Sequence, residues 1–171
     1  MGVDSKAKIL GKISDKEIMN VIKEVLGVDA VSDVKTWDCG KLDDLDFPFR
    51  NYGDEDHWIE EHGFITFEYN GEKRMLFYSH SNINVYENID YYKSMFPDRE
   101  DIVKMIKSET TSLSLGTWGS AIEILEKIIK KFGGWIDDND CDFIPYRYVE
   151  KEARLNTIRS PKIKICFRRM E

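Results

Sequence analysis

The segment Ser112–Asp142 places the strongest constraint on how this chain of 171 residues can fold. Leu113 and Leu115 alternate with serine, and such alternation is typical of a strand with one buried face. A glycine-flanked turn and a run of apolar residues at helical spacing follow. Gly133-Gly134 predict the end of this helix, and Trp135-Ile136 predict a second strand. The rest of the chain must therefore pack around a strand–helix–strand unit.

Two Ser-x-x-Glu sequences predict the starts of helices. In such a capping box, the serine hydroxyl and the glutamate carboxylate each bond a backbone N–H of the first turn. The two pairs are Ser14 with Glu17, and Ser120 with Glu123. Gly27 predicts the end of the first helix. The apolar faces comprise Ile18, Val21, Ile22, Val25 and Leu26 in the first helix, and Ala121, Ile124, Leu125, Ile128 and Phe132 in the second.

Asn70-Gly71 predicts a tight hairpin between the strands Phe64–Tyr69 and Glu72–Ser79. Both central residues of a type I′ turn need positive φ angles, which asparagine and glycine adopt readily. We expect one face of the hairpin to carry Ile65, Phe67 and Tyr69 opposite Met75 and Phe77. The turn fixes two neighbouring antiparallel strands early in the sheet.

Shorter patterns complete the fold. Strands are predicted near Val34–Trp37 and Ile163–Phe167, and helices over Glu87–Phe96 and from Asp98 onward. Helices that alternate with hairpin-connected strands favour an α+β protein. We expect a single domain over residues 1–171, with an antiparallel or mixed β-sheet and about three to four helices packed against it.

Charge is distributed unevenly along the chain. The segment Asp38–His62 holds nine acidic residues against two basic ones, a difference equal to the net charge of −7 of the whole chain. It is predicted to be a long acidic loop with one helical turn near Asp54–Glu61, and loops of that length are often functional. From Lys151 onward, seven basic residues stand against two acidic ones. This asymmetry indicates either solvated surfaces or an acidic surface that steers a basic partner.

The sequence indicates a soluble, cytoplasmic protein. Its longest apolar runs are shorter than the roughly 20 residues of a membrane span, and its first residues lack the apolar core of a signal peptide. The three cysteines, Cys39, Cys141 and Cys166, are odd in number and widely spaced, which argues against a disulfide framework.

Four residues form a candidate zinc site. Cys39, His57 and His62 lie in or beside the acidic loop, and Cys141 completes the set if the fold brings it near. Zinc prefers cysteine sulfur, histidine nitrogen and carboxylate oxygen. The spacing matches no zinc finger or ribbon. The alternative is that the cysteines are isolated and the histidines lie on the surface.

Enzymatic signatures are sparse. Asp138, Asp140 and Asp142 would share one face of a strand, where they either hold a divalent cation or form an exposed acidic turn. Phe143 replaces the glycine that a calcium-binding loop of this kind requires, so an EF-hand is excluded. The chain contains no GxSxG, GxGxxG or GK[ST] motif. We therefore expect a protein without catalytic activity.

The segment SLSLGTWGSAIEILEKIIKKFGGWIDDNDCD resembles small proteins carried by phages and integrated elements of Gram-positive bacteria, over roughly residues 110–145. As a class, the chain is similar to the small acidic anti-CRISPR and other anti-defence proteins found in that setting. This resemblance implies a non-catalytic inhibitor that binds a CRISPR effector nuclease and blocks nucleic-acid loading. It implies a protein partner in the host cytoplasm, without direct binding of nucleic acid or membrane.

An acidic surface with aromatic anchors suits such a partner, because nucleic-acid channels are lined with lysine and arginine. The alternatives are a toxin-neutralising immunity protein and a metal-dependent hydrolase or nuclease. The residues predicted to bind a partner are Asp43, Asp44, Asp46, Asp54, Glu55, Asp56, Glu60, Glu61 and Trp58.

Overall fold

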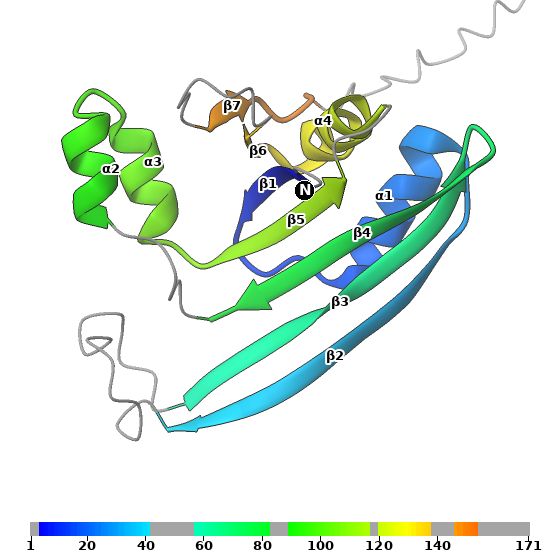
Figure 1. Ribbon diagram of the computed structural model, residues 1–171, viewed down its shortest axis with the longest axis horizontal. Coiled ribbons are helices and arrows are strands. Elements are labelled where there is room, and N and C mark those ends of the chain that lie inside the picture. Colours follow the sequence, from blue (N-terminus) through cyan, green and yellow to red (C-terminus); the bar gives the residue numbers. More distant parts are fainter. Residues whose placement is uncertain (1–3, 42–56, 83–88, 117–119, 138–145, 154–171) are drawn as a thin grey trace, which may run out of the picture.

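The computed structural model describes residues 4–41, 57–82, 89–116, 120–137 and 146–153 (Figure 1). Within these ranges the chain forms an antiparallel sheet of seven strands in the order β2-β3-β4-β5-β1-β6-β7. The strands are β1 (Asp4–Leu10), β2 (Ala30–Lys41), β3 (His57–Tyr69), β4 (Glu72–Ser81), β5 (Thr110–Gly116), β6 (Gly134–Asp137) and β7 (Arg147–Val149). The helices are α1 (Asp15–Leu26), α2 (Ile89–Met95), α3 (Glu100–Ile106) and α4 (Ala121–Phe132). The chain is therefore an α+β protein, as the sequence predicts.

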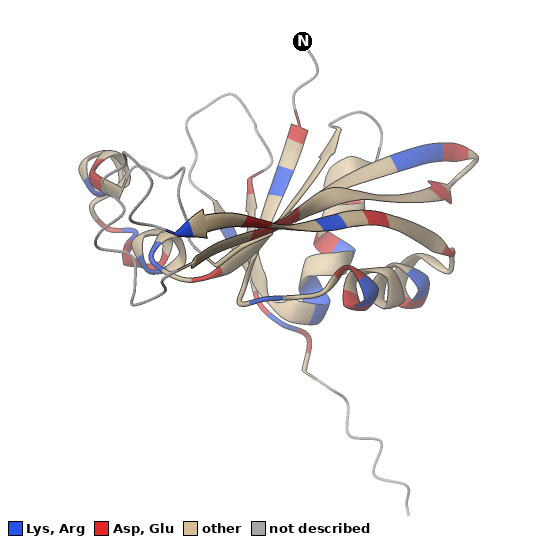
Figure 2. Cartoon of the chain, turned by 90° about the horizontal axis from the view of Figure 1, so that it is seen from below, with Lys and Arg blue, Asp and Glu red and all other residues tan. Residues whose placement is uncertain are grey.

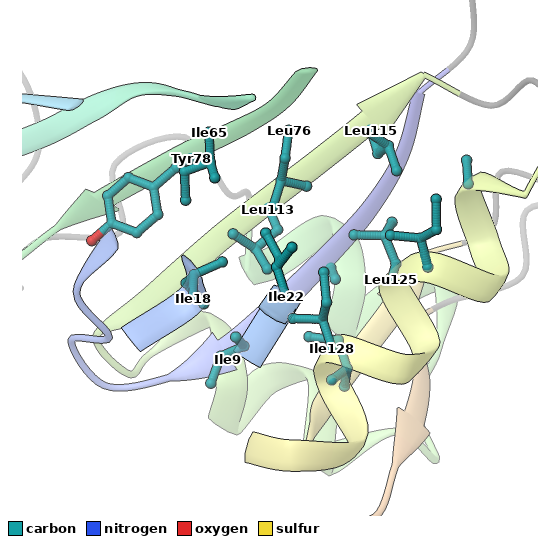
Figure 3. Packing of buried hydrophobic residues seen from close by; sticks show 14 of the residues in the cluster. Ile9, Ile18, Ile22, Ile65, Leu76, Tyr78, Leu113, Leu115, Leu125 and Ile128 are labelled. Carbon is teal, nitrogen blue, oxygen red and sulfur yellow. The ribbon is translucent and has the colours of Figure 1, made fainter. Parts of the chain in front are cut away.

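Helices α1 and α4 pack on one side of the sheet, called here the core face (Figure 3). Every second residue of the central strands points to this side and is buried there. Burying each large aliphatic side chain contributes about 1.5–3 kcal/mol. The core includes Ala7, Ile9, Ile65, Leu76, Tyr78, Leu113 and Leu115 from the strands, and Ile18, Ile22, Ile124, Leu125 and Ile128 from the helices.

The capping box of α1 is confirmed. The Ser14 hydroxyl accepts a hydrogen bond from the Glu17 N–H (3.3 Å), and the Glu17 carboxylate accepts one from the Ser14 N–H (2.9 Å). Gly27 ends the helix at φ 72°. The second predicted box is wrong, because Ser120 makes no side-chain cap and its ψ of 25° departs from the extended conformation that capping requires.

The hairpin of β3 and β4 is confirmed, with Asn70 at φ 54° and Gly71 at φ 76°. Its predicted faces are wrong. The two-residue turn pairs Tyr69 with Glu72, so odd-numbered residues of β3 lie opposite even-numbered residues of β4. Ile65 therefore shares the core face with Leu76. Met75 and Phe77 lie on the opposite face, beside Thr66 and Phe64.

The predicted acidic loop is wrong at both ends. Strand β2 continues to Lys41 and β3 begins at His57, so residues 38–41 and 57–62 belong to a ladder with a β-bulge between Asp38 and Lys41. The predicted helical turn is wrong over His57–Glu61, which is strand. Pairing between distant strands overrides local composition here. Residues 42–56 lie outside the described part of the chain.

Helix α3 forms a second apolar cluster on the other side of the sheet. Its Ile102, Met105 and Ile106 pack with Trp135 and Tyr146. The prediction that Asp98 caps a helix is wrong. Arg99 precedes α3 and makes no cap, but its guanidinium pairs with both carboxylate oxygens of Asp101, at 2.8 and 2.9 Å. The predicted strand near residues 163–167 lies outside the described residues.

Every helix in the described part of the chain is too short or too polar to span a lipid bilayer.

Candidate interaction surface

The outer face of the sheet is the side turned away from α1 and α4. In an antiparallel ladder, directly paired residues lie on the same face and their side chains touch. The register therefore defines rows of side chains that cross the sheet. From β2 inward they are Val31–Thr66–Met75, Asp33–Phe64–Phe77–Ser114–Lys6, Lys35–His62–Ser79–Ser112–Lys8 and Trp37–Glu60–Ser81–Thr110–Leu10.

Exposed apolar and aromatic side chains meet on these rows, over β2, β3 and β4. The exposed fractions are 69% for Val31, 51% for Met75, 41% for Phe64 and 40% for Trp37. We call the group Val31, Trp37, His62, Phe64, Met75 and Phe77 the aromatic patch. Contiguous exposed apolar surface of this kind is a candidate interaction site.

Ring contacts hold the aromatic patch in shape. The Trp37 and His62 rings are stacked with centroids 4.0 Å apart. The Phe64 ring meets the Phe77 ring edge-on at 5.6 Å, and His62 lies 6.3 Å from Phe77. Such aromatic pairs contribute stabilisation in addition to that from the apolar area they bury. The patch is therefore a preformed surface, which lowers the entropic cost of binding.

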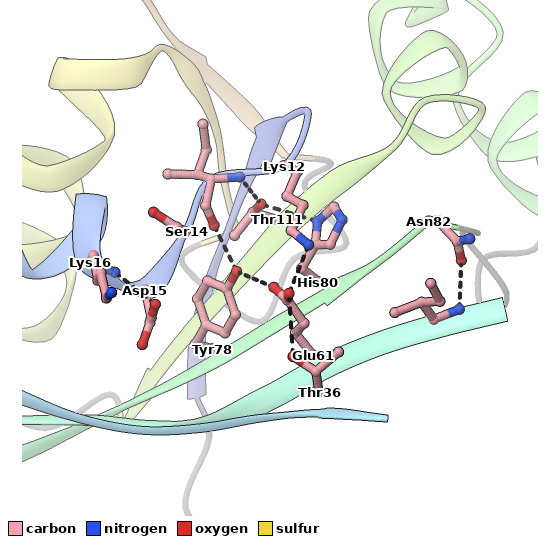
Figure 4. Close-up of polar contacts among 12 residues, drawn as sticks. Lys12, Ser14, Asp15, Lys16, Thr36, Glu61, Tyr78, His80, Asn82 and Thr111 are labelled. Atoms are coloured by element: carbon pink, nitrogen blue, oxygen red, sulfur yellow. Dashed lines mark hydrogen bonds and ion pairs between the residues drawn. The ribbon is translucent and has the colours of Figure 1, made fainter. Parts of the chain in front are cut away.

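A polar cluster lies at one end of the core face, where the segment before α1 crosses the sheet (Figure 4). The Tyr78 hydroxyl donates to the Ile13 carbonyl (2.6 Å) and lies 3.3 Å from the Glu61 carboxylate. Lys12 pairs with the same carboxylate at 2.7 Å. Burial, reinforced by Glu61, raises the pKa of Tyr78 well above its ordinary value. The phenol therefore stays neutral and ties the chain to the sheet.

His80 is the buried titratable group of this cluster, with 4% of its side chain exposed. Its Nε2 lies 3.1 Å from the Glu109 carboxylate, and its Nδ1 lies 3.4 Å from the Thr111 hydroxyl. Burial lowers the pKa of His80, although Glu109 and Glu61 oppose this shift and Lys12 adds to it. The folded protein therefore favours the neutral imidazole.

We expect this histidine to make the fold sensitive to mild acid. Because its pKa is lower in the folded state, the stabilisation is complete above the unfolded pKa of about 6.5 and is lost as pH falls through the folded pKa. The urea midpoint of unfolding should therefore fall between pH 7.5 and 5, and less steeply in His80→Gln. An equal slope in His80→Gln and the unmodified protein would contradict this assignment.

The predicted acidic residues that the structure describes do not share one surface. Glu60 lies on the outer face between Trp37 and Ser81, whereas Glu61 lies on the core face opposite His80. Trp58 donates from Nε1 to the Ser81 hydroxyl at 2.8 Å. Acidic and basic residues are interspersed over the described chain (Figure 2). The other predicted partner-binding residues, Asp43, Asp44, Asp46, Asp54, Glu55 and Asp56, lie outside the described residues.

The two histidines of the predicted zinc site lie on opposite faces of the sheet. His57 Nδ1 lies 3.3 Å from Asp38, and both residues are on the core face of the sheet. His62 instead stacks on Trp37 of the outer face. Among the described residues, there is no group of three or more His, Cys, Asp and Glu side chains that could hold a metal ion. Cys141 lies outside these residues, as do Asp138, Asp140 and Asp142.

A nucleophilic role for Cys39 finds no support in its surroundings. Its thiol is free, and its pKa is raised by partial burial and by the nearby carboxylates Glu60 and Asp38. Catalytic cysteines instead need a lowered pKa, since the thiolate is the nucleophile. The pair formed by Asp38 and His57 therefore lies beside a poorly activated thiol.

Sequence reasoning missed the aromatic patch, although one signal for it was present. The two-residue Asn70-Gly71 turn already sets Phe64 opposite Phe77 and Thr66 opposite Met75. That these residues remain exposed depends on which face the helices cover.

We compared the chain with protein-family models, curated proteins and solved structures, and none of the three comparisons gives a match.

Proposed function

We propose that the protein is a single-domain, non-catalytic binding protein that contacts a partner protein through its aromatic patch. The observation that carries this proposal is the contiguous exposure of Val31, Trp37, Phe64 and Met75 on three adjacent strands. Helices α1 and α4 pack on the core face, and α3 packs against Trp135 and Tyr146. The patch is thus left to solvent by the described helices.

The composition of the surface resembles that of protein interfaces. Their centres are enriched in tryptophan, phenylalanine and methionine, and their rims are polar. The rows of the outer face follow this pattern, since charged residues surround the apolar ones. These charged residues are Asp33, Lys35, Glu60, Glu68 and Lys73.

The partner class follows from the resemblance to anti-CRISPR proteins, which implies a CRISPR effector nuclease. Six of the predicted acidic residues belong to the segment that joins Lys41 to His57, next along the chain to the strands of the patch. Carboxylates near an apolar anchor speed the approach to a basic channel, while the apolar contacts slow dissociation. The proposed inhibitor uses both the carboxylates and the apolar contacts.

Phe64→Glu combined with Met75→Glu is expected to weaken inhibition of such a nuclease at least tenfold, because two charges would enter the centre of the contact. The measurement is cleavage of plasmid DNA by purified CRISPR effector nucleases of Gram-positive bacteria, with increasing inhibitor. Both side chains are half exposed or nearly so, so the fold should survive. Far-ultraviolet circular dichroism checks this.

Ile122→Glu is the matched control, because Ile122 is also an exposed apolar residue (36%) but belongs to α4. It should inhibit like the unmodified protein. Equal losses in the control and the patch variant would contradict the role of the patch.

A further variant with Asp43, Asp44, Asp54 and Glu55 changed to lysine tests the contribution of the acidic residues to inhibition. If the unmodified protein leaves plasmid cleavage unchanged for every nuclease tested, the proposed class of partner is contradicted.

A further inference from the structure

The outer face also holds a pocket of about 300 Å³ over β4, β5 and β1. Two rows of paired residues form its floor. One row is Phe77–Ser114–Lys6 and the other is Ser79–Ser112–Lys8. Tyr146 lines it as well. We call these seven residues the Lys–Ser pocket.

The polar side of this pocket suits an anion. Lys6 and Lys8 project from β1 to the same face, and three serine hydroxyls lie on the neighbouring strands. Lys8 is only 8% exposed, so salt screens its charge less than that of a surface lysine. The row of Lys6 carries two acidic residues, Asp33 at its far end on β2 and Asp137, which pairs with Lys6. Hydrogen bonds from ammonium groups and hydroxyls to phosphate oxygens are the strong, charge-assisted kind.

The other side of the pocket suits a flat ring. Phe77 lies at one end of the floor and is held by its edge-on contact with Phe64 at 5.6 Å. Tyr146 is 6% exposed, and its side chain packs in the cluster of Ile102, Met105, Ile106 and Trp135. Both rings are therefore fixed before a ligand arrives. Ligand pockets of proteins span roughly 300–1,000 Å³, and this one lies at the lower limit.

We propose that the Lys–Ser pocket binds a small phosphate ester that carries a flat ring, of the size of a mononucleotide. The phosphate lies beside Lys6, Lys8 and the serine hydroxyls, and the ring lies against Phe77 and Tyr146. This site takes a small molecule and is separate from the protein partner proposed above. The two rest on different residues, except that Phe77 borders both.

The test is calorimetric titration of the full chain with AMP, UMP, adenosine and inorganic phosphate. We expect a nucleotide to bind at least tenfold more tightly than either phosphate or adenosine alone, because only the nucleotide reaches both sides of the pocket. Lys6→Gln should weaken nucleotide and phosphate about tenfold, since it removes a charged contact. Phe77→Leu should weaken the nucleotide but leave phosphate unchanged.

Lys16→Gln is the matched control, because it removes an exposed lysine from α1, on the core-face side. It should bind like the unmodified protein. Absence of binding by both nucleotides at millimolar concentration would overturn the proposal, as would unchanged affinity in Lys6→Gln. Phosphate that binds as tightly as AMP would overturn recognition of the ring. Lys6 lies outside the aromatic patch, so Lys6→Gln should still inhibit the nuclease, and the two proposals can fail separately.

Discussion

Gly63→Ala is expected to lower the free energy of unfolding by about 3 kcal/mol or more, the upper range for overpacking a well-packed site. A Cβ at this position would overlap the carbonyl oxygen of Asp33 and lie 2.7 Å from Cα of Val34. Both are backbone atoms of β2, so relief requires separating β2 from β3. Urea unfolding followed by circular dichroism and tryptophan fluorescence measures the loss.

Gly71→Asn is the control for Gly63→Ala. It adds a larger side chain in the turn that joins β3 to β4, at φ 76°, where a Cβ meets nothing within 4 Å. Asparagine tolerates positive φ, so the cost should stay below about 1 kcal/mol. A loss in Gly63→Ala as small as that of the control would show that β2 shifts freely against β3.

The position of Gly63 also matters for the aromatic patch. His62 and Phe64 flank it and point to the outer face, whereas Gly63 points to the core face opposite Tyr78. The close approach that glycine permits therefore brings β2, with Trp37, against the rings of β3. Stability and patch geometry depend on the same residue, so Gly63 variants are unsuitable for testing binding.

The parts of the fold that follow from local rules were predictable. The capping box of α1 involves residues three positions apart, and the Asn70-Gly71 turn involves neighbours. The Ser120–Glu123 pair shows the limit of this reasoning, because the same pattern occurs with a backbone that cannot cap. A sequence motif indicates which capping hydrogen bonds a segment could make. The backbone conformation at the cap residue determines whether they form.

The ends of β2 and β3 were not predictable for a different reason. The predicted strand near Val34–Trp37 is part of β2, but the strand continues to Lys41 only because Asp38 pairs with Ile59 and Lys41 pairs with His57. The same pairing separates Glu60 from Glu61 and His57 from His62, since a strand turns successive side chains to opposite faces. The charge summed along a segment therefore overestimates the charge that one face of the sheet carries.

The aromatic patch and the Lys–Ser pocket meet at Phe77, which contacts Phe64 on one side and pairs with Ser114 on the other. Variants at Met75 and Lys6 separate the two sites, whereas Phe77→Leu disturbs both. A ligand in the pocket would contact Phe77, whose ring packs against Phe64 of the aromatic patch. If both proposed ligands bind, this shared residue gives a physical route by which each changes the affinity for the other, with equal factors in both directions.

Trp135→Ala is expected to lower the free energy of unfolding by about 3–5 kcal/mol, the usual cost of removing a large buried aromatic residue. Trp135 is 5% exposed and packs with Ile102, Met105 and Ile106, so it joins α3 to the sheet. Its Nε1 donates to Asp101 at 3.0 Å. Arg99, aided by this bond, lowers the pKa of Asp101 to about 2, so the carboxylate stays charged as an acceptor.

Amide hydrogen exchange should show where the stability is lost. In Trp135→Ala, the amides of α3 should exchange faster than those of α1, because α1 belongs to the separate core around Ile18 and Ile22. Trp135→Phe keeps a ring but loses the hydrogen bond to Asp101, so it should cost about 1–2 kcal/mol and leave α3 protected. Equal acceleration of α1 and α3 in Trp135→Ala would mean that the two cores unfold as one unit, and that α3 is an integral part of the sheet's cooperative structure.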